Sequence, residues 1–174
     1  MNWSPPRAPA RKGRIAAVMH LEYFQMIDRI LDLDTVGKKI TVEAHVPVQS
    51  TIFEGHFPGY PIMPGVLLIE SMAQTSGWLL VALMKFERMP FLAAVKEAKM
   101  RGFVSPGETL TIDASLVHEG SGYAITEARI KVAGKLRCNS TLTFSHVPFP
   151  NPDLRGHMDA VARRIGFPQQ VLQS

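Results

Sequence analysis

The sequence predicts an α+β fold in which one long apolar helix is wrapped by an antiparallel sheet of about five to six strands. From Pro64 onwards, about 22 residues are apolar nearly all round, which corresponds to a helix of about 33 Å. Such a helix in a globular chain must be covered on most of its sides. Segments with apolar residues at every second position, separated by short Gly-containing turns, supply the cover. One buried helix enclosed by one antiparallel sheet is the hotdog architecture.

The elements before the long helix follow from local patterns. Residues 23–33 are expected to form a short helix or turn that leads into a strand, and residues 35–38 a turn. Residues 39–47 alternate between apolar and polar side chains, which is typical of a strand. Residues 50–65 are so rich in Gly and Pro that we expect a rigid, specifically shaped loop.

The elements after the helix form a meander of antiparallel strands. Strands are expected within residues 91–104, 109–116, 123–132 and 136–144. Turns are expected at residues 105–107, at residues 120–122 and at Gly134. These turns are short, so consecutive strands are predicted to pair with each other.

We divide the chain into three parts. Residues 1–18 are expected to be a flexible basic arm, because this segment carries basic residues and three prolines. Its charges are not followed by an apolar core, so it is a poor signal peptide. Residues 19–147 form the hotdog domain, and residues 148–174 a Pro-rich extension with a short helix. Apolar residues recur at helical spacing in that extension: Leu154, Met158, Val161 and Ile165. This helix either packs on its own sheet or contacts a membrane or a partner.

Composition and charge exclude several classes of function. A length of 174 residues with 46% hydrophobic and 20% charged residues indicates one ordinary globular domain. The single cysteine, Cys138, excludes a disulfide framework and a Cys-rich zinc site. Four basic residues lie within residues 1–14, and the remaining 15 basic residues balance 15 acidic ones. The neutral domain removes the usual argument for nucleic-acid binding.

The same reasoning bears on membranes and metals. The most apolar segment, residues 66–86, contains Glu70, Gln74 and several hydroxyl groups, too many polar side chains for a good membrane span. We therefore expect no stable membrane insertion and a cytoplasmic protein. The six histidines show no metal-ligand spacing, so we expect no metal and no cofactor.

His56 is the first candidate catalytic residue. It lies in the Gly- and Pro-rich loop, directly before the long helix, whereas His45, His118 and His146 fall in strand patterns. Histidine exchanges protons near neutral pH, and a stiff loop limits its freedom as proton abstraction requires. A loop histidine with a purely structural role remains the alternative.

Glu70 is the second candidate, because a carboxylate in the most apolar helix is costly unless it is paired, protonated or facing a cavity. Gln74 lies one turn later on the same face and can hydrogen-bond to it. A buried structural glutamate satisfied by backbone groups is the alternative. Gly65 begins the helix, so its N–H points outward and suits a developing oxyanion. A base, an acid and an oxyanion donor are the parts needed for α-proton abstraction and elimination.

Residues 55–74 read GHFPGYPIMPGVLLIESMAQ. This run resembles the pattern GHFPGxPxxPGVLxxEAMAQ of the 3-hydroxyacyl-[acyl-carrier-protein] dehydratases of the Z type, with Ser71 in place of Ala. Weaker similarity runs from about His20 to Phe144. The related A-type dehydratase/isomerases carry Asp where this chain has Glu70, so the resemblance favours dehydration without isomerisation.

The resemblance implies a role for each residue of the motif. His56 would abstract the C2 proton of a (3R)-hydroxyacyl thioester, and Glu70 of the partner subunit would protonate the departing 3-hydroxyl. The Gly65 N–H would polarise the thioester carbonyl, and Gln74 would orient Glu70. Phe57 and Pro58, next to His56, would help to position the substrate. The product is a trans-2-enoyl thioester, formed in fatty acid synthesis or in a specialised long-chain or lipid A acyl pathway.

The resemblance also implies partners. Members of this family form hotdog homodimers with active sites at the interface, commonly assembled as hexamers, and they act on an acidic acyl-carrier protein. Lys99 and Arg101 match basic positions that face this carrier, although a solvated strand edge would carry the same residues. In the family an N-terminal segment lies near the acyl tunnel, and only His20 and Phe24 of this chain match it. The C-terminal extension is longer than is usual in the family.

Two other functions remain open. A hotdog thioesterase would use a carboxylate to activate water at the thioester carbonyl, and would release free thiol. A non-catalytic acyl-binding hotdog protein would bind acyl groups without turnover. A mere binding protein has no reason to keep a buried acid, so the presence of both His56 and Glu70 argues against the second.

Overall fold

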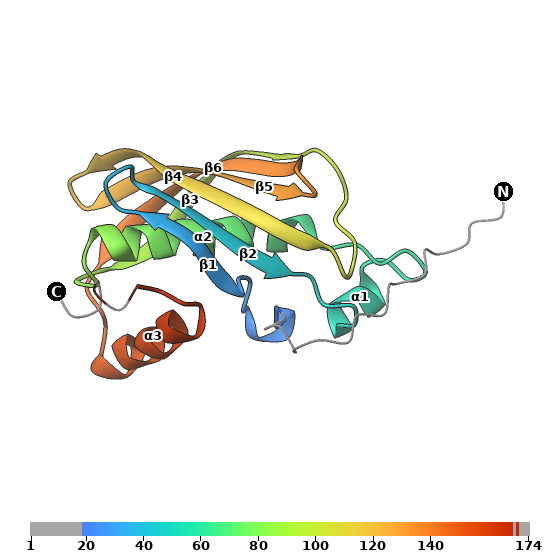
Figure 1. The fold of residues 1–174 in the computed structure, drawn as a ribbon, viewed down its shortest axis with the longest axis horizontal. Helices are drawn as coiled ribbons and strands as arrows, with labels where there is room; N and C mark the ends of the chain where they lie inside the picture. The colour runs from blue at the N-terminus through green and yellow to red at the C-terminus, as the bar shows by residue number, and fades with distance from the viewer. Residues whose placement is uncertain (1–18, 169, 171–174) are drawn as a thin grey trace.

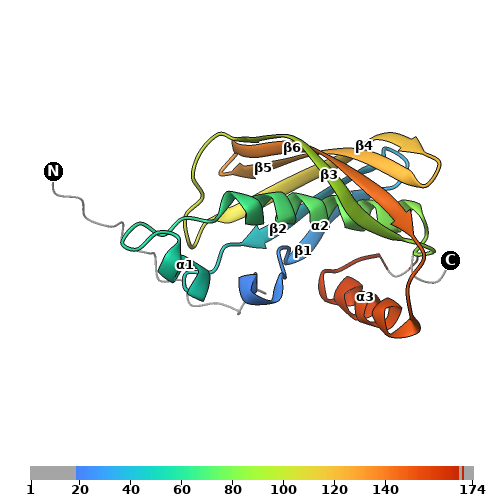
Figure 2. The same ribbon diagram turned by 180° about the vertical axis from the view of Figure 1, so that it is seen from behind.

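The computed structural model describes residues 19–168 and 170. The predicted basic arm, residues 1–18, lies outside the described residues, as do residue 169 and residues 171–174 of the predicted extension. The described elements form a sheet, a long helix beneath it and a smaller helix on the far side of that helix (Figures 1 and 2).

The sheet has six antiparallel strands in the spatial order β1-β2-β4-β5-β6-β3. The strands are β1 (Arg29–Asp34), β2 (Lys39–His45), β3 (Met89–Met100), β4 (Thr109–Gly120), β5 (Tyr123–Val132) and β6 (Lys135–Val147). The β4-β5-β6 meander confirms the prediction from the alternating segments and their short turns. The strand expected at the end of residues 23–33 is β1, but the short helical turn before it, η1 (Leu21–Tyr23), lies two residues earlier than predicted.

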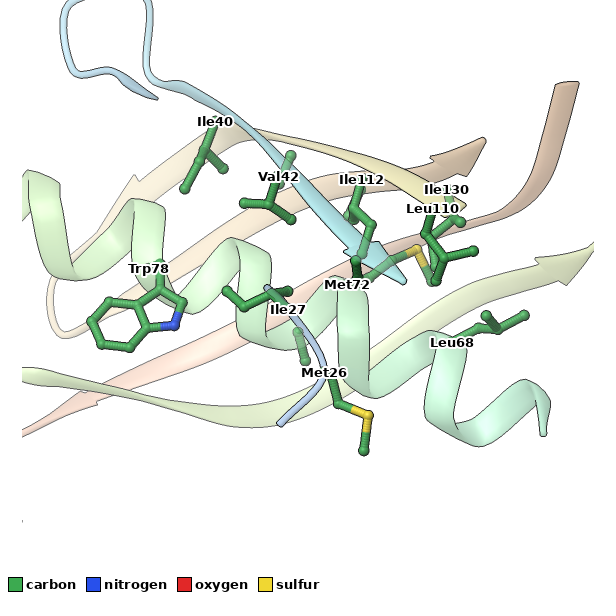
Figure 3. Packing of buried hydrophobic residues seen from close by; sticks show 14 of the residues in the cluster. Met26, Ile27, Ile40, Val42, Leu68, Met72, Trp78, Leu110, Ile112 and Ile130 are labelled. Carbon is green, nitrogen blue, oxygen red and sulfur yellow. The ribbon is translucent and has the colours of Figure 1, made fainter. Parts of the chain in front are cut away.

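The long helix α2 (Gly65–Leu83) lies along the inner face of the sheet, which curls over it (Figure 1). Met72 of α2 lies beside Leu110 and Ile112 of β4 in the core (Figure 3), and all three side chains are fully buried. The sole cysteine, Cys138 of β6, is buried in the same core. By length and mean hydropathy of 1.5, α2 is apolar enough to cross a membrane, but 67% of it is buried inside the protein. It is the core helix that the sequence predicts.

The end of α2 differs from the prediction, because the helix has 19 residues and stops at Leu83. The Lys85 N–H donates to the Ala82 carbonyl and the Phe86 N–H to the Val81 carbonyl, which is a Schellman termination. Lys85 adopts a left-handed φ of 51° without being glycine. Phe86 is fully buried at this turn, so its packing, which no local signal announces, ends the helix.

The segment before α2 also differs, because part of the expected rigid loop is the short helix α1 (Thr51–Gly55). Ser50 caps it by accepting a hydrogen bond from the Ile52 N–H. Glu22 holds the cap from outside by accepting bonds from the Ser50 hydroxyl at 2.6 Å and from the Thr51 N–H. These hydrogen bonds lower the pKa of Glu22, with the Ser50 hydroxyl as the largest cause.

The predicted C-terminal helix is present as α3 (Pro152–Arg164), capped by the side chain of Asn151. It lies near the C-terminal end of α2 (Figures 1 and 2) and packs on its own chain, as one of the two alternatives had it, with partly buried Met158 and Val161 against the core. The Phe167 ring, which follows α3, lies 5.6 Å from Trp78 and 6.1 Å from Phe86. The Ile30 N–H of β1 donates to the Ile165 carbonyl at 2.8 Å. The extension is therefore an integral layer of the fold.

Candidate functional site

The backbone around His56 holds its ring in one orientation. His56 is the residue that ends α1, and its carbonyl accepts from the Ile62 N–H while its Nδ1 lies 3.1 Å from the Ile62 carbonyl oxygen. A carbonyl oxygen only accepts, so the proton is on Nδ1 and the lone pair is on Nε2. The half-buried ring also stacks on Phe57, with centroids 4.4 Å apart. Among the described residues this leaves Nε2 as the ring nitrogen that can accept a proton.

The N-terminus of α2 follows a few residues later. Pro64 is its N-cap and provides no side-chain acceptor, while its carbonyl accepts from the N–H groups of Leu67 and Leu68. The N–H groups of the first turn have no partner within a helix, and the helix dipole makes this end positive. The Met100 side chain lies beside Gly65, with its end 3.3 Å from where a Cβ would be, so a larger residue here would require Met100 to shift. The Gly65 N–H lies at this positive end of the helix.

Glu70 and Gln74 form one hydrogen-bonded unit on α2. The Gln74 Nε2 donates to Glu70 Oε1 at 2.9 Å and to the Phe24 carbonyl at 2.6 Å, and its Oε1 accepts from the Met26 N–H. Because a backbone N–H can only donate, the Met26 contact fixes which end of the amide faces Glu70. The Glu70 side chain is only half-buried in the single chain, which is less than the burial that the apolar pattern of the helix predicts. One carboxylate oxygen is thereby fixed by Gln74.

An apolar groove begins at Glu70 and follows one face of α2. It has a volume of about 400 Å³. Its α2 wall consists of residues three or four positions apart: Glu70, Ala73, Gln74, Gly77, Trp78 and Val81. The other walls come from the start of β3, from Phe144 and from His157, Met158 and Val161 of α3. The only acidic side chain of the groove is the candidate proton donor.

The two candidate groups do not share a cavity within one chain. The groove at Glu70 includes no residue of the His56 loop. Phe57 and Pro58 of that loop line a separate hollow with Glu22 and α1. The side chain of Phe57 is 52% exposed, so the described residues leave an apolar surface uncovered on this loop.

Lys99 and Arg101 are both exposed at one end of the edge strand β3. Lys99 Nζ lies 3.0 Å from the carboxylate of Glu97, and Arg101 Nε donates to the Asn139 side chain at 2.8 Å. Both cations are thus held at the surface by neighbours on the same sheet. Within residues 19–168 and 170, no three His, Cys, Asp or Glu side chains gather where they could hold a metal ion.

Sequence reasoning missed the two backbone groups that hold Gln74. They belong to Phe24 and Met26, about 50 residues away in the chain. The resemblance points to Phe24 as part of the N-terminal segment, but nothing in the sequence indicates that its carbonyl, rather than its ring, makes the contact. The α3 wall of the groove was missed for the same reason, because it depends on tertiary packing.

Solved structures share this fold at low sequence identity. A hypothetical thioesterase with coenzyme A from Streptococcus pneumoniae aligns with a TM-score of 0.56 and 17% identity, covering 71% of this chain and 88% of that one. A hypothetical protein from Staphylococcus aureus aligns with a TM-score of 0.60 and 14% identity, covering 75% and 100%. These likenesses support the hotdog fold and no more.

Sequence relatives are much closer. Residues 19–140 match the FabA-like domain family. The chain is 37% identical over 119 residues to "3-hydroxyacyl-[acyl-carrier-protein] dehydratase FabZ" of Lactiplantibacillus plantarum, covering 68% of this chain and 80% of the relative. It is 36% identical over 133 residues to the FabZ of Streptococcus pyogenes, covering 75% and 93%. The chain therefore belongs to the FabA-like family of hotdog proteins, among the 3-hydroxyacyl-[acyl-carrier-protein] dehydratases.

Proposed function

We propose that this protein removes water from (3R)-hydroxyacyl thioesters of acyl-carrier protein, with His56 as the base and Glu70 as the acid. The observation that carries the proposal is the Glu70 carboxylate, fixed by Gln74 at the start of an apolar groove. A thioester with an acyl chain in this groove would bring its C3 hydroxyl near the carboxyl group. A non-catalytic acyl-binding groove needs no such acid.

The proton balance follows from these positions. His56 Nε2 takes the C2 proton, and the electrons of the C2–H bond form the C2=C3 double bond. The C3–O bond breaks, and protonated Glu70 gives its proton to the departing hydroxyl, which leaves as water. A proton returning from His56 to Glu70 resets both groups. The Gly65 N–H stabilises negative charge on the thioester oxygen while the C2 proton is being removed.

We also propose that each active site combines two copies of the chain, His56 from one and Glu70 from the other. The edge strand β3 supports a dimer, because residues 93–100 are exposed and one side of the strand has no neighbour among the described strands. Val95 and Met100 on β3 and Phe103 beyond it are exposed apolar side chains, 42%, 45% and 65% accessible. A trimer of such dimers is the assembly the family implies, and the cytoplasm is the compartment we expect.

The acidic carrier protein would dock at Lys99 and Arg101. Their exposure at the end of β3, beside the proposed dimer edge, supports this assignment. Charge reversal of Arg101 should raise KM for carrier-bound substrates several-fold and leave KM for coenzyme A thioesters unchanged. Equal effects on both substrates would place the residue outside the carrier interface.

The direct test is hydration of crotonyl-CoA, followed by loss of the enoyl thioester absorbance, with free thiol measured in parallel. We expect hydration without thiol release, and a fall in kcat of about a thousandfold in His56→Ala and in Glu70→Gln. His118→Ala is the matched control, since His118 is an exposed strand residue. Thiol release would establish a thioesterase instead, and tight acyl binding without turnover a binding protein.

The shared site has its own test, because two inactive variants can complement each other. In a heterodimer of His56→Ala and Glu70→Gln chains, one site would have both wild-type groups and the other neither. Equal mixing after dissociation should then restore about a quarter of wild-type activity, since half of the dimers are mixed. No restoration would mean that each chain supplies both groups of its own site.

A further inference from the structure

We propose that helix α3 of the C-terminal extension is a specificity element, and that Met158 and Val161 form the wall that lets the groove hold a long acyl chain. The inference rests on the proposed function, because it concerns the substrate of the same site. It goes beyond family membership, since the family match ends at residue 140 and α3 begins at Pro152.

The position of α3 carries the argument. The groove along α2 would be open on one side without the α3 residues that line it, His157, Met158 and Val161. Met158 and Val161 are partly buried and pack against the hydrophobic core, while His157 is exposed at the rim. Apolar groups therefore face the groove, and the polar group of this wall faces water.

The anchoring of α3 makes this wall fixed. The fully buried Ala162 and Ile165 attach its C-terminal turn to the core, and the guanidinium of Arg155 lies 4.5 Å from the Phe86 ring centroid. The Phe167 N–H donates to the Ala162 carbonyl and the Gly166 N–H to the Arg163 carbonyl, which ends the helix in a Schellman motif. A wall held at both ends can set the length and width of a groove.

The dimensions indicate the occupant. Glu70 and Val81 are eleven residues apart on α2, or about 16 Å. An extended alkyl chain advances by about 1.25 Å per carbon–carbon bond, so this length holds about twelve to thirteen bonds. The groove begins at the acid that acts on C3 and is apolar beyond Gln74, which suits the alkyl tail of the substrate. The walls predict a preference for medium to long acyl chains.

The test compares two chain lengths in one assay, hydration of crotonyl-CoA and of trans-2-dodecenoyl-CoA. Val161→Trp should narrow the groove at its α3 wall and exclude about four methylenes, each worth about a fourfold change in binding. We expect kcat/KM for the twelve-carbon thioester to fall more than about fiftyfold, with crotonyl-CoA hydration within about twofold of wild type. Ala160→Trp is the matched control, because Ala160 is exposed on α3 outside the groove.

A second variant protects the test against misfolding. Met158→Ala removes part of the wall without adding bulk, and should raise KM for the twelve-carbon thioester about fivefold to tenfold, again with little effect on crotonyl-CoA. Unchanged chain-length ratios in both variants would overturn the inference. A change of oligomeric state without a change in selectivity would overturn it too, and would assign the groove to a second copy of the chain. If wild-type protein hydrates neither thioester, the proposed function itself fails.

Discussion

The segment that carries His56 and Glu70, residues 51–83, and the C-terminal extension, residues 148–168, are held in place in different ways. In the first segment the contacts that orient these two side chains are local: His56 is oriented by Ile62, and Glu70 by Gln74 one helical turn away. In the extension the decisive contacts are distant, such as Phe167 on Trp78 and the hydrogen bond between Ile30 and Ile165. Local contacts orient the proposed catalytic side chains, and distant contacts hold the extension that lines the groove. Substitutions in the first segment should therefore change activity, and substitutions in the extension should change stability.

The largest effect on the folded state is expected from Phe167→Ala. Phe167 is 2% exposed and contacts Trp78 and Phe86, so its removal leaves a cavity between α2 and the extension. We expect the free energy of unfolding to fall by about 3–5 kcal/mol, measured by chemical denaturation. At a temperature where the variant is folded, crotonyl-CoA hydration should persist.

Tyr23→Ala is the control for that variant, because the Tyr23 side chain is 77% exposed. Its removal should lower the free energy of unfolding by less than about 0.5 kcal/mol. A stable Phe167→Ala protein would show that the extension is not anchored as described. A stable variant that has lost crotonyl-CoA hydration would contradict the separation of chemistry from packing.

A smaller effect, confined to chemistry, is expected from Gln74→Ala. The variant removes the hydrogen bond to Glu70 and those to Phe24 and Met26, so Glu70 loses its fixed orientation. A hydrogen bond between neutral groups contributes about 0.5–1.5 kcal/mol, so loss of the bond to protonated Glu70 should lower kcat about twofold to tenfold. KM for crotonyl-CoA should stay near its wild-type value. An increase in KM with unchanged kcat would mean that Gln74 binds substrate rather than positioning the acid.

The smallest effect concerns pH and the buried Asp28, which lies outside both segments. Burial raises the pKa of Asp28 above its usual 3.8. This effect outweighs the lowering of the pKa by the His45 ring and backbone N–H, which bond to the Asp28 carboxylate at 2.9 and 2.7 Å. The folded state thus holds this proton more tightly than the unfolded state. The stability that Asp28 contributes is fully present below pH 3.8 and is lost as pH rises through the raised pKa.

Asp28→Asn should therefore flatten the pH dependence of unfolding over that acidic range, measured as the difference from wild type in urea midpoints. Asn keeps an acceptor for the His45 N–H, and Asp32→Asn on the exposed β1 edge serves as the control. A difference that grows in the opposite direction, with wild type losing stability as pH falls, would reverse the assigned sign.

Within residues 51–83 the sequence predicts the body of α2 and the Glu70–Gln74 pair, because these depend on near neighbours. The alternation of Leu110, Ile112 and Ala114 predicts β4, and the motif at residues 55–74 predicts which groups face one another along α2. The prediction is weaker where a residue distant in sequence determines where a helix begins or ends. Nothing near residue 84 indicates that the burial of Phe86 ends α2, and the cap on α1 depends on Glu22, 28 residues before Ser50.

The site shows the same division. The Gln74–Glu70 hydrogen bond follows from the four-residue spacing. The hydrogen bonds of Gln74 with the backbone of Phe24 and Met26 cannot be predicted from any spacing. The helical spacing of Leu154, Met158 and Val161 predicts α3, but not the groove face that two of them line. Periodicity identifies which side of an element is apolar, and only the packed structure identifies what that side covers.

The burial of Cys138 gives the protein a built-in reporter of its own opening. Burial raises the pKa of this thiol to about 11, so at neutral pH it carries no thiolate, and its side chain is fully inaccessible in the folded chain. An alkylating reagent should therefore react only when β6 separates from its neighbours. Because the sequence has a single cysteine, the labelling rate reports one event without ambiguity. The same thiol can then follow how substrate, or any substitution in α3, changes the rate at which the sheet opens.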